Sequence, residues 1–292
     1  MRYLCIILAI LTLPCLAQTT KKKKKLPYEF PFDSSIEEMY LTVRINLVIL
    51  QRSDGTGNFD EKNEEHRAVL NEMKWMFNEI FSNNRSYLDT GCYSGKYEVS
   101  ADSKLRFKID EMFIKNTHYW DNTDQALCPD KQNWYLDHLD DSINAIPGRK
   151  PSINIYYTES SRFYKALVLD KNCSDSLKVP KGACSMWPSD KYDYMRIHIP
   201  NYFLKYNSMK NCVANSAKYN FVDWPGVRWW FLDWYSKTTA HELGHALGLA
   251  HRNKCAENLM HVGTYGIFLS ADEIRLMKQN LLTKNIRRYI EE

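Results

Sequence analysis

Four stretches of the chain have the hydrophobic pattern of β-strands. Residues 39–50 alternate apolar and polar side chains and then become continuously apolar, which is typical of a strand that enters a buried sheet. Three shorter stretches also have the composition of strands. They are residues 105–114, 152–157 and 194–199. The pattern therefore predicts a sheet in which the first strand, residues 39–50, is buried in the interior.

Three other stretches have the spacing of helices. In residues 61–81, apolar side chains recur every three or four positions, which predicts a long amphipathic helix. Residues 137–146 predict a short helix that Pro147 and the following glycine end. Residues 271–282 predict a helix near the C-terminus, in which Ser270 is the N-cap and Glu273 completes a capping box.

Residues 53–58 contain glycine and predict a loop between the first strand and the long helix. Asp54 in this loop and Asp60 just after it resemble the acidic residues of a calcium loop. Their spacing does not match the EF-hand pattern, so a plain connection is the better interpretation. A structural calcium ion is therefore not indicated.

Residues 241–251 read His-Glu-Leu-Gly-His-Ala-Leu-Gly-Leu-Ala-His. His241 and His245 are four residues apart, so on a helix their imidazoles project from one face. Gly248 can adopt a left-handed backbone, which lets the chain turn back and bring His251 to the same centre. Three imidazoles with an open fourth position predict a catalytic zinc ion, and Glu242 is placed to take a proton from a water molecule there. The alternative is an amphipathic core helix with solvated histidines, which explains neither the glycine nor the third histidine.

This stretch resembles the zinc signature of the metzincin metalloendopeptidases. In that clan a methionine on a tight turn lies beneath the zinc, and the resemblance implies that Met260 is this Met-turn residue. The sequence is most similar to matrixins and their bacterial relatives. Arg252 and Val262 depart from the matrixin pattern, in which serine and proline are usual, so the subfamily stays open.

The resemblance also implies the fold. We expect an α+β protein with a twisted mixed sheet, a long backing helix, an active-site helix and a small C-terminal subdomain that ends in a helix. The catalytic domain would cover residues 39–292, divided into an upper subdomain, residues 39–250, and a lower subdomain, residues 251–292. Thr238 or Thr239 could cap the start of the active-site helix, in which case Glu242 would have a capping role as its alternative. Four tryptophans precede this helix within residues 224–234, and a core role for them is favoured over a pocket wall.

The N-terminus predicts export. Residues 1–17 combine Arg2, an apolar run and small residues before Gln18, which is the layout of a secretory signal peptide. Pro14 argues against lipidation at Cys15, and the apolar run is shorter than the ~20 residues that span a bilayer. Residues 18–38 then form a lysine-rich leader, for which a simple tail is the favoured interpretation. The alternative is a short pro-segment in which Asp33 or Glu29 would occupy the zinc.

Charge and cysteine content agree with an exported globular protein. The formal net charge is +4, and it falls to +3 without Arg2 and to −2 when the five lysines 21–25 are also left out. The body is thus nearly neutral, which argues against nucleic-acid binding. Six cysteines remain outside the signal peptide and predict up to three disulfides. Of the possible pairs, Cys173 with Cys184 and Cys212 with Cys255 are plausible, but the connectivity stays open.

The chemistry and the resemblance together predict a secreted or periplasmic zinc endopeptidase that acts on proteins or peptides, without stable membrane insertion and as a monomer. Glu242 would act first as general base and then as general acid. A thermolysin-type site would need a glutamate some twenty residues past His245, and Glu257 and Glu273 do not fit that spacing. A non-catalytic secreted binding protein with a structural zinc site is the remaining alternative, and the presence of Glu242 argues against it.

Overall fold

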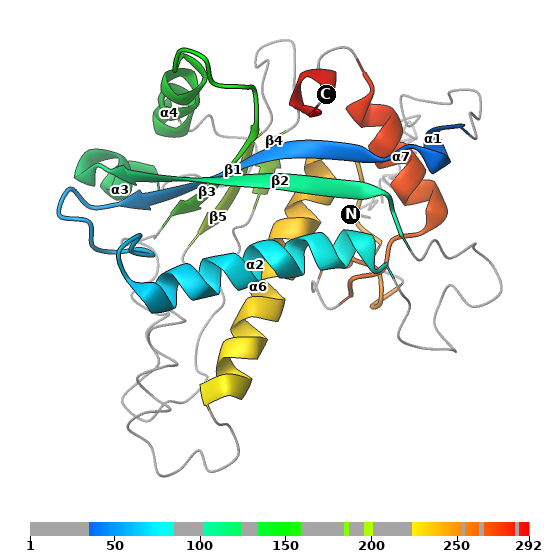
Figure 1. Ribbon diagram of the computed structural model, residues 1–292, viewed down its shortest axis with the longest axis horizontal. Helices are drawn as coiled ribbons and strands as arrows, with labels where there is room; N and C mark the ends of the chain where they lie inside the picture. The colour runs from blue at the N-terminus through cyan, green and yellow to red at the C-terminus, as the bar shows by residue number, and fades with distance from the viewer. Residues whose placement is uncertain are drawn as a thin grey trace, which may run out of the picture. The chain divides into compact units, whose positions relative to one another are not determined.

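The computed structural model describes most of the chain between Ser35 and Glu291 (Figure 1). Ser34–Glu292 form one compact unit. The described residues are 35–84, 102–123, 134–158, 184–186, 196–200, 224–252, 255–262, 266–283 and 286–291. Within these ranges, no helix is both long and apolar enough to cross a membrane.

A five-stranded mixed sheet lies at the centre of this unit, and the α+β prediction is confirmed. The strand order is β2-β1-β3-β5-β4. Neighbouring strands run parallel except for β4, which is antiparallel to β5 at the edge. The bounds are β1 Leu41–Gln51, β2 Leu105–Lys115, β3 Ile153–Thr158, β4 Cys184–Met186 and β5 Arg196–Pro200.

Helices cover both faces of β1, which explains its continuous apolar run. Val43, Ile45 and Leu47 alternate along the strand, so they share one face, and they pack in the main core with α2 (Glu64–Ser82) and α6 (Trp224–Ala246). Val48 and Leu50 belong to a second cluster with α3 (Thr117–Thr123) and α4 (Trp134–Asn144). A strand that is buried on both faces has no solvent side on which to place polar residues.

The long helix α2 begins slightly later than predicted. The Asn63 side chain accepts hydrogen bonds from the backbone N–H groups of Glu65 and His66 and so caps the first turn. The predicted apolar stripe of the helix is buried, except that Met76 is only partly buried. Its buried members are Val69, Leu70, Met73, Phe77 and Ile80.

The C-terminal helix α7 (Ala271–Leu281) starts with the predicted capping box of Ser270 and Glu273. A short helix α1 (Ser35–Glu38) lies beside it, although these residues belong to the predicted leader. Arg275 forms an ion pair with Glu37, and Lys278 Nζ donates to the Glu37 carbonyl oxygen at 2.8 Å. The chain then ends in the 3-10 turn η1 (Arg287–Tyr289).

Candidate metal centre

Helix α6 carries the first two histidines of the motif, and it begins much earlier than predicted. It runs without interruption from Trp224 to Ala246. Thr238 and Thr239 are therefore interior residues rather than N-caps, and the prediction of a cap there is wrong. Thr239 Oγ1 donates to the Tyr235 carbonyl oxygen one turn earlier, at 2.9 Å. Since no helix starts at this point, the capping alternative for Glu242 also falls away.

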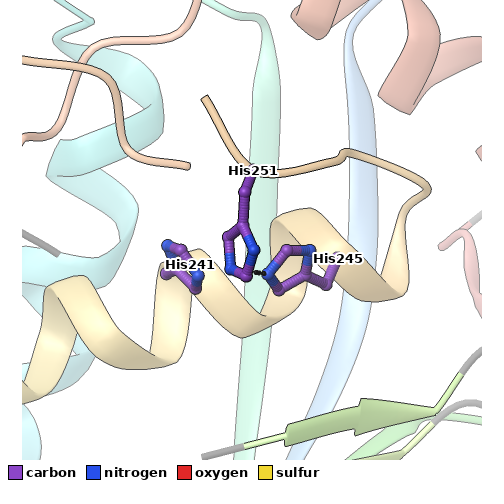
Figure 2. A group of neighbouring side chains, drawn as sticks. All are labelled: His241, His245 and His251. Carbon is purple, nitrogen blue, oxygen red and sulfur yellow. Dashed lines mark hydrogen bonds between the residues drawn. The ribbon is translucent and has the colours of Figure 1, made fainter. Parts of the chain in front are cut away.

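The chain reverses after α6 and returns to the same face of the helix, as the sequence predicts. Gly248 has a φ angle of 95°, a left-handed conformation that favours glycine. The Leu249 N–H donates to the Gly244 carbonyl oxygen at 2.9 Å and closes the turn. His251 then lies against the two imidazoles that project from α6 (Figure 2).

The three imidazoles converge closely enough to hold one ion. One ring nitrogen from each of His241, His245 and His251 lies within 4.8 Å of the others. The Nε2 atoms of His245 and His251 are 3.0 Å apart. Among the described residues, this is the only group of three or more histidine, cysteine or acidic side chains that is so arranged.

Backbone carbonyls orient the two helical histidines. His241 Nδ1 lies 2.7 Å from the Leu259 carbonyl oxygen, and His245 Nδ1 lies 2.8 Å from the Leu249 carbonyl oxygen. Because a carbonyl oxygen can only accept a hydrogen bond, each Nδ1 must carry the proton. In the neutral ring the lone pair is then on Nε2, and metal-binding histidines are oriented in this way.

The surroundings favour the neutral form of the His241 and His245 imidazoles. Burial lowers the pKa of His241 to about 4, against the opposing effect of its hydrogen bond to Leu259, and the nearby rings of His245, His251 and His261 lower it further. Burial also lowers the pKa of His245. Neutral imidazole is the form that binds a metal ion, so the donor set fits a metal at neutral pH. His241 is buried, His245 is half-buried and His251 is exposed, so the centre opens to solvent on the His251 side.

Glu242 follows the first histidine and is largely buried, with an exposure of 7%. On the helix it lies one residue from His241 and three from His245, so it shares the turn that carries these two imidazoles. A buried carboxylate at this position is suited to proton transfer next to a bound ion.

Met260 is buried beneath α6. A Cβ atom added to Gly244 would overlap the Met260 sulfur, so the thioether lies directly against the helix between His241 and His245. The Met260 N–H donates to Asn258 Oδ1 at 2.6 Å, and its carbonyl oxygen accepts from the Arg252 N–H at 2.9 Å. The absence of a side chain at Gly244 thus leaves room for the sulfur, which no local sequence pattern indicates.

Gly266 holds the turn that contains Met260. A Cβ atom there would overlap the carbonyl group of Glu257, where the 266–268 segment bonds to the 257–259 segment. We expect Gly266→Ala to lower the free energy of unfolding by about 3 kcal/mol, since backbone atoms cannot move aside cheaply. Chemical denaturation checks this.

Gly148→Ala is the control for this substitution. Gly148 has a φ angle of 76°, but nothing lies within 4 Å of an added Cβ atom. The free energy of unfolding of this control should therefore fall by only about 1–2 kcal/mol, the strain of an alanine in the left-handed conformation. Equal losses in the two variants would contradict the proposed overlap.

Several other sequence predictions concern residues that the structure describes only in part. Cys255 is disulfide-bonded, while Cys212 and Cys173 lie outside the described residues, so the pairings stay predictions. The backbone of 224–234 is helical, but the tryptophan side chains in it lie outside the description. In the 53–58 loop, Asp54 Oδ1 accepts from the Thr56 N–H at 2.9 Å, as in an ordinary turn.

Comparisons with known proteins add little to this picture. No family model matches the sequence, and the search of curated proteins found no match. Among solved structures, the chain is similar to wild-type OgpA from Akkermansia muciniphila, with a TM-score of 0.40 and 16% sequence identity. The match covers 80% of this chain and 59% of the OgpA chain, so this chain spans less than two thirds of its length. At these values the likeness says nothing about activity, which has to be inferred from the site.

Proposed function

We propose that the chain is a zinc-dependent endopeptidase of the metzincin type. The observation that carries this proposal is the convergence of three imidazoles on a turn that also carries a buried glutamate, with a methionine sulfur against the same helix. The mixed sheet with α2 and α6 packed on one face is in keeping with the fold that the motif implies.

We propose that the ion is zinc. Three imidazoles without thiolates or clustered carboxylates favour zinc over calcium or magnesium, which prefer oxygen ligands. His241, His245 and His251 would hold the ion. When bound, it supplies Lewis-acid chemistry that lowers the pKa of a water molecule to ~7 and polarises a peptide carbonyl.

Glu242 would carry the proton transfers. Its carboxylate accepts a proton from the attacking water and returns it to the amine that leaves, so one side chain acts as base and then as acid. Burial beside the histidines limits the access of bulk water to this carboxylate. His241 and His245 are held by carbonyl oxygens, so the site would not need to reorganise before it binds its ion.

The edge of the sheet offers a place for the substrate backbone. β4 lies against α6 and is the last strand of the described sheet, antiparallel to β5. An extended peptide can add to such an edge through main-chain hydrogen bonds. We therefore infer protein or peptide substrates that bind in an extended conformation.

Export belongs to the same proposal. The signal-like residues 1–17 and the disulfide at Cys255 both suit an oxidising compartment outside the cytoplasm. We therefore propose that the enzyme is secreted or periplasmic.

Digestion of a proteome-derived peptide library tests the activity. We expect internal cleavage that 1,10-phenanthroline abolishes and that added zinc restores, measured by mass spectrometry of the products. Zinc binding without any cleavage would instead support a secreted binding protein with a structural zinc site. Cleavage that survives removal of the metal would contradict the proposed mechanism.

A further inference from the structure

The third histidine is held differently from the other two. His241 and His245 each donate from Nδ1 to a backbone carbonyl oxygen. His251 is exposed, and within the described ranges the only hydrogen bond of its ring is the one to His245 Nε2. Its position therefore depends on the backbone that follows it.

Arg252 fixes that backbone through two contacts. Its N–H donates to the Met260 carbonyl oxygen at 2.9 Å, and its Nε donates to Glu273 Oε1 at 3.0 Å. The Arg252 side chain is 58% exposed, whereas the Glu273 side chain is only 3% exposed. The contact thus joins a surface cation to a buried carboxylate at the start of α7.

The Glu273 carboxylate also binds the segment that carries Met260. Its Oε2 accepts from Asn258 Nδ2 at 2.8 Å, in addition to the capping bond from the Ser270 N–H at 2.9 Å. Asn258 in turn accepts from the Met260 N–H. Arg252 and Asn258, the two ends of the 252–258 segment, therefore both bind the Glu273 carboxylate. Capping of α7 would require only the bond to Ser270, so these two contacts are additional to it.

We propose that Glu273, acting through Arg252 and Asn258, is the positioning residue that holds His251 in place as the third metal ligand. The inference rests on the proposed function only in that the three histidines bind zinc. Outer-shell partners set the orientation of metal ligands, and their loss typically weakens metal binding by about 10–100-fold.

Arg252→Gln in the full-length protein tests the proposal. The variant removes the charged contact to Glu273 while keeping a long polar side chain at the surface. Arg275→Gln is the matched control, because Arg275 lies on α7 and pairs with Glu37 and Asp272 instead. Zinc affinity is measured by competition with a chromophoric chelator, and the melting temperature of each zinc-free protein is measured alongside.

We expect zinc binding to weaken by about 10–100-fold in Arg252→Gln and by less than about twofold in Arg275→Gln, with similar melting temperatures for the two zinc-free variants. In a double-mutant cycle, the effect of Arg252→Gln on zinc affinity should shrink when Glu273 is already glutamine, because the two residues act as a pair. If Glu273→Gln fails to fold, the comparison of the two arginine variants still decides the matter.

Zinc affinity within about twofold of wild type in Arg252→Gln would overturn the proposal. The readout also separates it from the proposed enzyme activity. A wild-type protein that binds zinc but cleaves no peptide overturns the peptidase function alone, whereas one that binds no zinc overturns both.

Discussion

Glu242→Gln is expected to lower kcat by about 10²–10⁴-fold, the usual contribution of a general acid and base. Glutamine has nearly the same size and shape as glutamate but cannot accept the proton from water. The buried position of Glu242 should therefore stay filled and the three histidines unchanged. Kinetics on a peptide taken from the library digest, together with the zinc content of the purified protein, check this expectation.

Glu61→Gln is the matched control. Glu61 precedes α2 and pairs with Lys115, with a side chain that is 41% exposed. This variant should keep wild-type kcat and zinc content. Undiminished cleavage by Glu242→Gln would remove the proposed base from the mechanism, even if the protein still carried zinc.

His241→Ala is expected to weaken zinc binding by more than about 100-fold, because it removes a ligand rather than one of the outer-shell partners, whose loss costs about 10–100-fold. His241 is the most buried of the three ligands, and its ring is held by the Leu259 carbonyl oxygen. Chelator competition measures the affinity, and peptide cleavage should fall in parallel.

His138→Ala serves as the control for loss of an imidazole, since His138 is exposed on α4. Circular dichroism of the zinc-free proteins shows whether each variant is folded. A folded His241→Ala protein with wild-type zinc affinity would mean that the ion binds somewhere other than at the three histidines.

Local patterns predicted the parts of the fold that depend on nearby residues. The continuous apolar run of residues 39–50 indicated the buried strand β1, and Ser270 with Glu273 indicated the start of α7. The convergence of the three histidines was predictable for the same reason, because one helical turn separates His241 from His245 and Gly248 permits the return of His251.

The first half of α6 was missed because it has no amphipathic stripe. Apolar and aromatic residues lie all around the helix in this part of the sequence, so no helical period stands out. Thr238 and Thr239 then resembled a helix start. Pro225, one residue after Trp224, is the signal that marks the true beginning, since proline is favoured in the first turn of a helix.

Contacts between distant segments could not be predicted. Glu273 was assigned only a capping role, because nothing in a local pattern indicates that its carboxylate also accepts from Arg252 and Asn258. The overlap between an added Cβ on Gly244 and the Met260 sulfur likewise depends on two segments that meet only in the folded chain. Strand β4 has three residues, too few for an alternating pattern to show.

Two of the three converging histidines lie among core residues on one helix. Leu243, Ala246 and Leu247 lie in the main hydrophobic cluster, within the same two turns as His241 and His245. The ligand-bearing turns therefore cannot unfold while the core stays intact, and any ion bound there stabilises the domain as a whole. By mass action this amounts to about 2.7 kcal/mol at a free zinc concentration of one hundred times Kd. The concentration of free metal ion in the compartment in which the chain folds would thus help to set the fraction of molecules that are folded.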